Sequence, residues 1–474
     1  METSTVGRGR FVADAVAAAA VGSFFGFGTL PIMVLSGFAA PASSGRVATM
    51  TPTVAVLTVL VVALVAPLTV FRPRRLSGWW VAAGGLLLTF LVELTVDAGQ
   101  NVLVPRPDHV GQLLVALLGA AGVGLALGGA LLALAQLPGP GRPQVAAALA
   151  FGLGFSAIGV LLPGRLLPEP GGPSGPAADD VLIWFALLAA VLAGALARRR
   201  VGRPGAPTGE ARPGAITVVV GAAVLTIVGI MLREQALPQP SVLDRPDLGA
   251  APSAEFVAAG AATLVGLLLV GYAWRAAGVT GARWVVLGAA AGPMSLLCAG
   301  YYQSVDSTAQ MLLMPAVGLA ASGAGVALAR HAPRQVPWDA LGLAVAAVMT
   351  PMLSPATRAE RQEIFLLASL LVAFGIGLAL GAGLTMTVTG PAGAGGGVLA
   401  ALALGPVALV VTTSTLAEAT TRMRLAGTAQ GTSYAIVTFT LLSALLLAAL
   451  HALARRPAAA TDVDGEPAAV RQLT

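Results

Sequence analysis

Residues 122–152 read GVGLALGGALLALAQLPGPGRPQVAAALAFG, and the chain nearly repeats this stretch at residues 375–405, GIGLALGAGLTMTVTGPAGAGGGVLAALALG. With a shift of 253 residues and no gap, 14 of the 31 positions are identical. They include the block Gly-x-Gly-Leu-Ala-Leu-Gly and the prolines Pro138 and Pro391, which favours duplication over chance identity in an Ala/Leu/Gly-rich sequence. Each copy is typical of a helix, a Gly/Pro-rich turn and a second helix. A unit repeated in two halves of a chain predicts a pseudo-symmetric helical bundle.

The composition indicates a membrane protein. Apolar residues make up 57% of the chain and charged residues 10%, whereas a soluble domain has about 25% charged residues. All 27 basic residues are arginine, and they lie in short segments beside apolar stretches, so the basic balance does not indicate a nucleic-acid partner. The single cysteine, Cys298, excludes an internal disulfide, and the three histidines are far apart in sequence. We therefore expect no metal site and no cofactor.

Apolar stretches long enough to cross a membrane recur along the whole chain. A spanning helix needs about 20 apolar residues. We expect fourteen spans, near 11–38, 51–71, 79–97, 110–137, 143–165, 180–198, 213–232, 254–273, 280–302, 309–330, 337–354, 362–387, 395–417 and 430–454.

The predicted fold is an all-α polytopic membrane protein with about fourteen transmembrane helices. The repeat pairs spans 4 and 5 with spans 12 and 13, which gives two pseudo-symmetric six-helix halves plus two inserted helices. The expected domains are an N-terminal half, a basic cytoplasmic linker with inserted helices 7 and 8, a C-terminal half, and a polar, disordered cytoplasmic tail. Their bounds are 1–198, 199–279, 280–456 and 457–474.

The arginine distribution predicts the orientation. With the N-terminus inside, the cytoplasmic segments hold 18 of the 27 arginines, Arg283 among them, and the outside loops hold nine. This bias favours two cytoplasmic termini in a multi-pass protein of the cell membrane. A second correspondence lies in the loops: Arg74 and Arg75 run into Trp79, and Arg334 runs into Trp338. The alternative for these two loops is an ordinary positive-inside loop with an interfacial tryptophan.

Six spans, two inserted spans and six more resemble the 14-span drug:proton antiporter branch of the major facilitator superfamily. The best local matches are APLTVFRPRR at 66–75, GYYQSVDSTAQMLLMPAVGLA at 300–320 and LALGAGLTMTVTGPAGAGGGV at 378–398. The resemblance implies transport of a small molecule by alternating access, with Arg74, Arg75 and Arg334 in gating loops.

The sequence departs from the family's motifs at the positions that would carry charge. The loop aspartate of the family falls at Val70, the aspartate of the first span at Gly22, and the buried arginine of span 4 at Val115. These departures argue against proton coupling by the family's own residues, because coupling needs an acid that can titrate inside the bundle.

Few ionisable residues fall inside an expected span. An ionisable group in the bilayer costs roughly 2.5 kcal/mol or more and is a functional candidate for that reason. Glu93 is the one carboxylate that we place well inside a span, about one turn from Asp97. The alternative is that Glu93 is solvated in the outer headgroup layer. We expect Asp14 to be solvated at the inner start of span 1, and His451 to lie at the inner interface.

Neutral polar residues could line a substrate path. The candidates are Gln112, Gln136, Tyr302, Gln303 and Thr385. The alternative is that a threonine bonds its own helix and that an interfacial tyrosine is an anchor. In each repeat two glycines are spaced i, i+4, which predicts close helix packing. These glycines are Gly124 and Gly128 in the first copy and Gly377 and Gly381 in the second.

The function that we predict is secondary transport, with export of an apolar or amphipathic small molecule. The sequence has no serine elbow, phosphate loop or metal-spaced His/Cys cluster, so we do not expect an enzyme. The expected partners are a small-molecule substrate and membrane lipids, with protons as a candidate coupling ion. Two alternatives stay open. One is a degenerate, non-transporting membrane scaffold or lipid-interacting partner; the other is a lipid-linked oligosaccharide flippase, which would need arginines within the spans.

Overall fold

The computed structural model describes ten long segments and several short pieces of the chain. The long segments are 11–38, 46–69, 77–101, 109–137, 178–199, 252–297, 308–331, 336–353, 355–389 and 429–455. The short pieces are 141, 144–146, 148–149, 152–153, 301, 305, 404–409 and 412. The expected span at 213–232, the linker 199–212 beyond Arg199, and the tail 457–474 lie outside the described residues.

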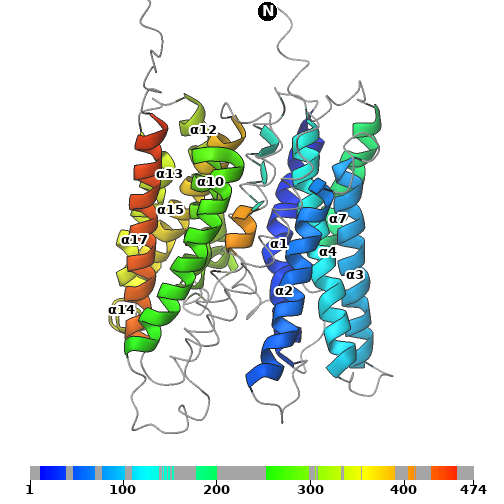
Figure 1. Ribbon diagram of the computed structural model, residues 1–474, viewed down its shortest axis with the longest axis horizontal. Coiled ribbons are helices and arrows are strands. Elements are labelled where there is room, and N and C mark those ends of the chain that lie inside the picture. Colours follow the sequence, from blue (N-terminus) through cyan, green and yellow to red (C-terminus); the bar gives the residue numbers. More distant parts are fainter. Residues whose placement is uncertain are drawn as a thin grey trace, which may run out of the picture.

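The described part of the chain is helical and contains no strand. Its helices form two groups that stand side by side (Figure 1). The first group contains α1 (Val12–Phe38), α2 (Arg46–Thr69), α3 (Gly78–Asn101), α4 (His109–Gln136) and α7 (Ala178–Arg199). The second contains α10 (Pro252–Leu297), α12 (Thr308–His331), α13 (Trp338–Met349), the 3₁₀ turn η2 (Thr350–Leu353), α14 (Pro355–Glu360), α15 (Gln362–Thr389) and α17 (Ala429–Ala454). We call them the N-group and the C-group.

The helices are apolar to the degree that a bilayer requires. Three described stretches are long and apolar enough to cross a membrane, Leu113–Gln136, Gln362–Thr387 and Ile436–Ala454. Six further described stretches are apolar but shorter, Val12–Phe25, Ala55–Leu68, Gly78–Val92, Ile183–Ala197, Thr263–Arg275 and Trp338–Leu353. Large apolar side chains such as Leu188 and Leu445 are more than half exposed, as expected where helices face lipid rather than water.

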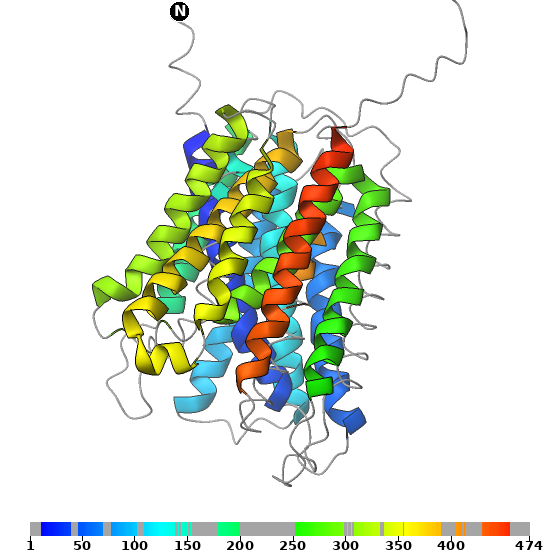
Figure 2. The same ribbon diagram turned by 90° about the vertical axis from the view of Figure 1, so that its left-hand side faces the viewer.

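Both groups use the same packing order. In the N-group α4 packs against α1, α2 and α3, and α7 packs against α1 and α3. In the C-group α15 packs against α10, α12 and α13, and α17 packs against α10 and α13. Every contact in the first set has a counterpart in the second. The helices α1, α2, α3, α4 and α7 of the N-group correspond in this order to α10, α12, α13, α15 and α17 of the C-group. Figure 2 shows α17 and α10 lying beside each other on the outer side of the C-group.

Helix α10 contains a break that separates two of the expected spans. Gly278 has φ 66° and ψ −155°, a backbone conformation that favours glycine, and it divides the continuous element Pro252–Leu297. The two expected spans at 254–273 and 280–302 lie on either side of this residue. The stretch after Gly278 takes the place in the C-group that α1 takes in the N-group.

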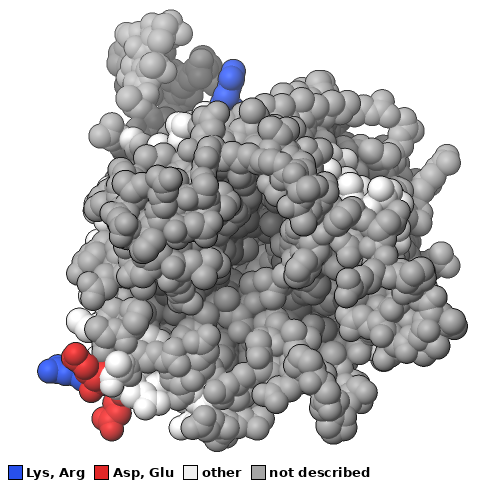
Figure 3. All heavy atoms as spheres, turned by 90° about the horizontal axis from the view of Figure 1, so that it is seen from below, with Lys and Arg blue, Asp and Glu red and all other residues white. Residues whose placement is uncertain are grey.

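The first described helix begins, and the last one ends, at the same end of the bundle (Figure 1). We call this the terminal end. At the other end, Glu360, Arg361 and Glu363 are exposed between α14 and α15, and Figure 3 shows acidic and basic atoms together at one edge of that face. The exposed charge at this end therefore lies where one helix ends and the next begins, outside the apolar faces of the bundle.

Candidate functional site

The two groups meet over apolar side chains. A small cavity lies between α1, α2 and the helical residues 404–409, which pack against α10 at Gly405 and which we count with the C-group. It is lined only by apolar residues, namely Phe25, Leu57, Leu60, Val61 and Leu64 of the N-group and Pro406 and Val407 of the C-group. The lining offers no charged group to a sugar or a phosphate, and the cavity, about 10 Å³ in volume, is too small to hold a substrate in this arrangement.

The repeated glycines lie where helices approach most closely. A Cβ atom at Gly124 would meet the Leu60 carbonyl oxygen of α2, and one at Gly377 would meet the Gly318 carbonyl oxygen of α12. One helical turn later, Gly128 and Gly381 repeat this contact with the carbonyl oxygens of Leu64 and Ser322. The i, i+4 glycines therefore form the contact face of α4 towards α2 and of α15 towards α12.

Two other glycine pairs of the repeat follow the same rule. Gly122 and Gly375 lie against the backbone of Gly85 in α3 and of Gly342 in α13. Gly152 lies against the Ala19 carbonyl of α1, and Gly405 lies against Gly288 of α10. The two glycines of each pair thus contact equivalent helices in the two groups. This close contact is a physical reason for a glycine at the same position in both copies of the repeat.

Only two of the polar transport candidates have side chains in the described part of the chain. The backbones of Glu93 and Asp97 lie in the second half of α3, and that of Gln112 lies at the start of α4, but their side chains are outside the described part. Tyr302, Gln303, Arg74, Arg75 and Arg334 also lie outside the described residues. Two candidates can be placed. Gln136 accepts a hydrogen bond from the Gly78 amide at 2.9 Å, and the Thr385 hydroxyl donates to the Gly381 carbonyl of its own helix at 2.7 Å.

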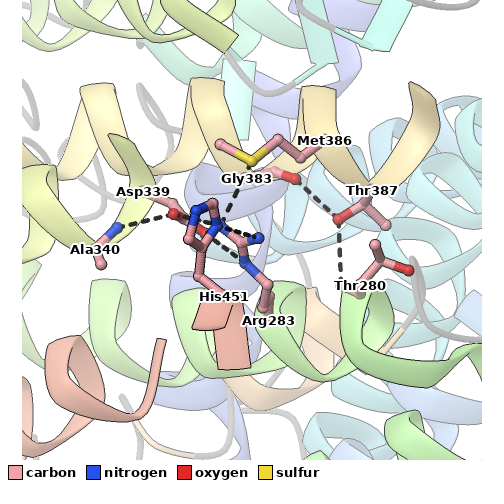
Figure 4. Close-up of polar contacts among 8 residues, drawn as sticks. All are labelled: Thr280, Arg283, Asp339, Ala340, Gly383, Met386, Thr387 and His451. Carbon is pink, nitrogen blue, oxygen red and sulfur yellow. Dashed lines mark hydrogen bonds and ion pairs between the residues drawn. The ribbon is translucent and has the colours of Figure 1, made fainter. Parts of the chain in front are cut away.

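A buried polar cluster lies in the C-group at the terminal end (Figure 4). Arg283 of α10 donates from Nη2 to both carboxylate oxygens of Asp339, at 2.6 and 2.7 Å, and from Nε to Oδ2 at 3.0 Å. Its Nη1 lies 3.1 Å from Nδ1 of His451 in α17, and Nη2 contacts the Met386 sulfur of α15 at 3.4 Å. Asp339 is fully buried at the second residue of α13, where the helix N-terminus also favours a negative charge.

The N-group has a simpler link at the matching place. Asp14, the third residue of α1, accepts a 2.8 Å hydrogen bond from the Trp79 indole nitrogen. Trp79 is the second residue of α3, as Asp339 is of α13. Asp14 and Trp79 are each about 1% exposed. Both groups therefore tie their first and third helices together at the terminal end, one with a carboxylate–indole bond and the other with an ion pair.

These placements correct two expectations. Asp14 was expected to be solvated, but it is buried against Trp79. Arg283 was assigned to a cytoplasmic loop, but it is a buried residue of α10 with 7% exposure. Asp339 is a further buried carboxylate, and the side chain of Glu93 lies outside the described part of the chain. Each of these residues lies within a few positions of an expected span end, where hydropathy cannot tell a side chain facing water from one facing a neighbouring helix.

Arg283 does not provide the cationic cavity that a flippase of lipid-linked oligosaccharides would need, because Asp339 neutralises it. The signal that could have found the pair is an arginine and an aspartate within the expected spans 280–302 and 337–354. Among the described residues, no group of three or more His, Cys, Asp and Glu side chains is placed to hold a metal ion.

No family model and no curated protein sequence matches this chain. Solved structures do match it. The proton:xylose symporter XylE from E. coli, bound to 6-bromo-6-deoxy-D-glucose, aligns with a TM-score of 0.53 and 13% identity over 93% of this chain and 96% of that one. A bacterial homologue of the iron transporter ferroportin in an outward-facing state aligns with a TM-score of 0.51 and 14% identity, over 93% and 99% of the two chains.

A third match is the POT family transporter PepTSo. Its TM-score is 0.50 and its identity 17%, with 93% of this chain and 97% of that one covered. All three alignments extend over both helix groups. At these low sequence identities, the structural match shows the fold and nothing finer. The chain therefore has the fold of the major facilitator superfamily, the superfamily to which the solved xylose symporter belongs.

Proposed function

We propose that this chain is a secondary transporter of the major facilitator type, which exports an apolar or amphipathic small molecule by alternating access. The fold and the two equivalently packed helix groups support transport, because alternating access moves two such groups about a site between them. The observation that carries the substrate class is the apolar lining between the groups, Phe25, Leu57, Leu60, Val61 and Leu64 facing Pro406 and Val407.

The matched structures do not indicate one substrate class for this chain. One is a xylose symporter, another is a homologue of an iron transporter and a third is a POT family transporter. We assign the chain to the 14-span antiporter-like branch because the sequence places two extra apolar spans between the halves. The domain bounds that we propose are 1–198, 199–279, 280–456 and 457–474, with the repeat as their basis.

Efflux from proteoliposomes tests the substrate class. A panel of amphipathic dyes should leave the vesicles faster than from protein-free controls, whereas xylose and a dipeptide should not. Leu60→Ser and Val407→Ser should slow dye efflux, because each puts a hydroxyl in the apolar lining. Leu188→Ser is the matched control, since Leu188 is 68% exposed on α7. Equal efflux of all compounds, or equal loss in all three variants, would refute the assignment; no efflux of any compound would favour the scaffold alternative.

The orientation that we propose places both termini in the cytoplasm. Single cysteines in 199–212 should be shielded from an impermeant thiol reagent in intact cells, and cysteines in 236–250 should be labelled. The native Cys298 is replaced by serine in all of these variants. The reverse labelling pattern would invert the orientation.

Glu93 remains the coupling candidate that we propose for proton-driven export. Its backbone lies inside α3, and an amide at this position would keep the shape of the side chain while removing the titrating charge. Glu93→Gln should abolish efflux driven by a pH gradient while the protein stays folded. Glu363→Gln, at an exposed position of α15, is the control. Unchanged gradient-driven efflux in Glu93→Gln would remove this residue from the mechanism, and saturable efflux that ignores the gradient would indicate a facilitator.

A further inference from the structure

The first half of α10, which precedes the break at Gly278, has one exposed face. The residues of this face follow one another at helical spacing, on the side of the helix away from the buried residues Val265, Leu269 and Ala273. They are Leu264, Leu267, Leu268, Gly271, Trp274 and Arg275. The leucines are between 43% and 51% exposed, and Trp274 is 41% exposed. This face, which we call the α10 outer face, is therefore apolar over most of its length and ends in an indole and a guanidinium.

The charged end of the α10 outer face lies at the terminal end of the bundle. Arg275 precedes Gly278 by three residues, and Arg283, five residues after Gly278, contacts His451 near the end of α17. Figure 2 shows α10 beside α17, and both reach the terminal end. Arg455 directly follows α17 and is exposed. Two exposed arginines therefore lie at the terminal ends of two neighbouring helices.

The positive charge at this end is not neutralised within the described part of the chain. Neither Arg275 nor Arg455 forms an ion pair with a described residue. At the opposite end, by contrast, Arg361 lies in sequence between the exposed acids Glu360 and Glu363. The terminal end of the α10 outer face thus attracts a group of negative net charge.

The α10 outer face has room for an acyl chain at Gly271. No atom lies within 4 Å of a Cβ built at this position, so the face has a notch between Leu268 and Trp274. Exposed leucines of a membrane helix contact hydrocarbon, and indole side chains lie at the level where the chains and the headgroups of the lipid meet. The order of leucine, glycine, tryptophan and arginine along the helix thus matches the order of chain, glycerol and phosphate in a phospholipid.

We propose that the α10 outer face binds an anionic phospholipid, with its phosphate at Arg275 and Arg455 and one acyl chain against Leu268 and Gly271. A guanidinium binds phosphate oxygens through paired hydrogen bonds. A headgroup of negative net charge relies on these arginines as its cations, whereas a zwitterionic headgroup carries an ammonium of its own. Each arginine near a membrane surface strengthens the binding of anionic lipid about fivefold.

Bromine quenching at a single site measures this selectivity. A bimane label at Leu268→Cys, with Cys298 replaced by serine, lies seven residues before Arg275, about 10 Å along the helix. In vesicles of phosphatidylglycerol and phosphatidylcholine, one lipid at a time is brominated in its chains, and the two quenching curves give the relative binding constant. Phosphatidylglycerol should be preferred by up to about 25-fold, the product of the two arginine contributions. A label at Leu367→Cys, 58% exposed near Glu363 at the opposite end, is the control and should show no preference.

Substitution of the exposed arginines tests their part in the site. Arg275→Gln should lower the preference at the Leu268 label about fivefold, and Arg275→Gln/Arg455→Gln should abolish it. Arg361→Gln, at the opposite end, is the matched control and should leave the preference unchanged. No preference at Leu268, the same preference at Leu367, or an unchanged preference in the double variant would overturn the proposal. None of these measurements uses a transported compound, so their outcome is independent of the proposed transport function.

Discussion

The N-group and the C-group share their packing but differ in the chemistry of their terminal ends. The glycine contacts of α4 with α2 and α3 recur between α15 and α12 and between α15 and α13. At the terminal end, by contrast, Asp14 accepts a bond from Trp79 in one group, while Arg283 pairs with Asp339 and reaches His451 in the other.

This difference shows which constraints persist after duplication. A glycine at a backbone-to-backbone contact cannot be replaced without moving a helix, so the repeat keeps it. A polar link between two helix ends can be made by several residue pairs of similar reach, so it can change while the packing stays. We therefore expect the stability of the two groups to respond alike to glycine substitutions and differently to substitutions in the polar links.

The largest difference is expected from the acidic members of the two links. Asp339→Asn leaves the Arg283 charge buried without its partner, which costs about 3 kcal/mol or more of unfolding free energy. Asp14→Asn keeps an acceptor for Trp79 and should cost about 1 kcal/mol. Unfolding of both variants in mixed micelles measures the difference. Equal costs would remove the distinction between the links, and Arg283→Met/Asp339→Leu should recover much of the loss because it removes both charges.

A smaller and equal effect is expected from the glycine pairs. Gly128→Ala and Gly381→Ala each place a methyl group against a backbone carbonyl of the neighbouring helix, which should cost about 1–3 kcal/mol in either group. Gly84→Ala and Gly323→Ala are matched controls, since nothing lies within 4 Å of a Cβ at these positions. Alanine is the better helix former by about 1 kcal/mol, so the controls should be neutral or stabilising. Thermal unfolding of all four variants gives the comparison, and a loss confined to one group would break the equivalence.

The smallest effect concerns threonine hydroxyls of the C-group. The Thr412 hydroxyl donates to the Ala289 carbonyl of α10 at 2.9 Å as well as to the Ala408 carbonyl four residues earlier at 2.7 Å. The buried Thr440 hydroxyl donates to the Ile436 carbonyl of its own helix, α17, at 2.7 Å. Thr412→Val should therefore cost about 0.6 kcal/mol, the usual value of an interhelical bond in a membrane protein, and Thr440→Val less. The same unfolding assay tests the order, and the reverse order would show that the interhelical bond does not stabilise the C-group.

The sequence predicted the helical class, the two-group plan and the equivalence of 122–152 with 375–405, because each is encoded in composition or in glycines at fixed spacing. It did not predict the polar links. Asp14, Arg283 and Asp339 lie near helix ends, and an apolar pattern there does not determine whether a charged side chain turns to water or to a neighbouring helix. Only the crossing of α10, α13 and α17 places Arg283 between Asp339 and His451.

The central claim is that two equivalently packed helix groups move against each other as units. Double electron–electron resonance in nanodiscs measures this with labels at Val12 and Arg330 for the terminal end and at Val110 and Glu360 for the opposite end; all four positions are exposed. A pair within the C-group, Leu341 with Glu360, is the control. We predict that a transported compound lengthens one between-group distance while it shortens the other, and that the control distance does not change. Between-group distances that stay fixed, or that change in the same direction together with the control, would contradict the claim.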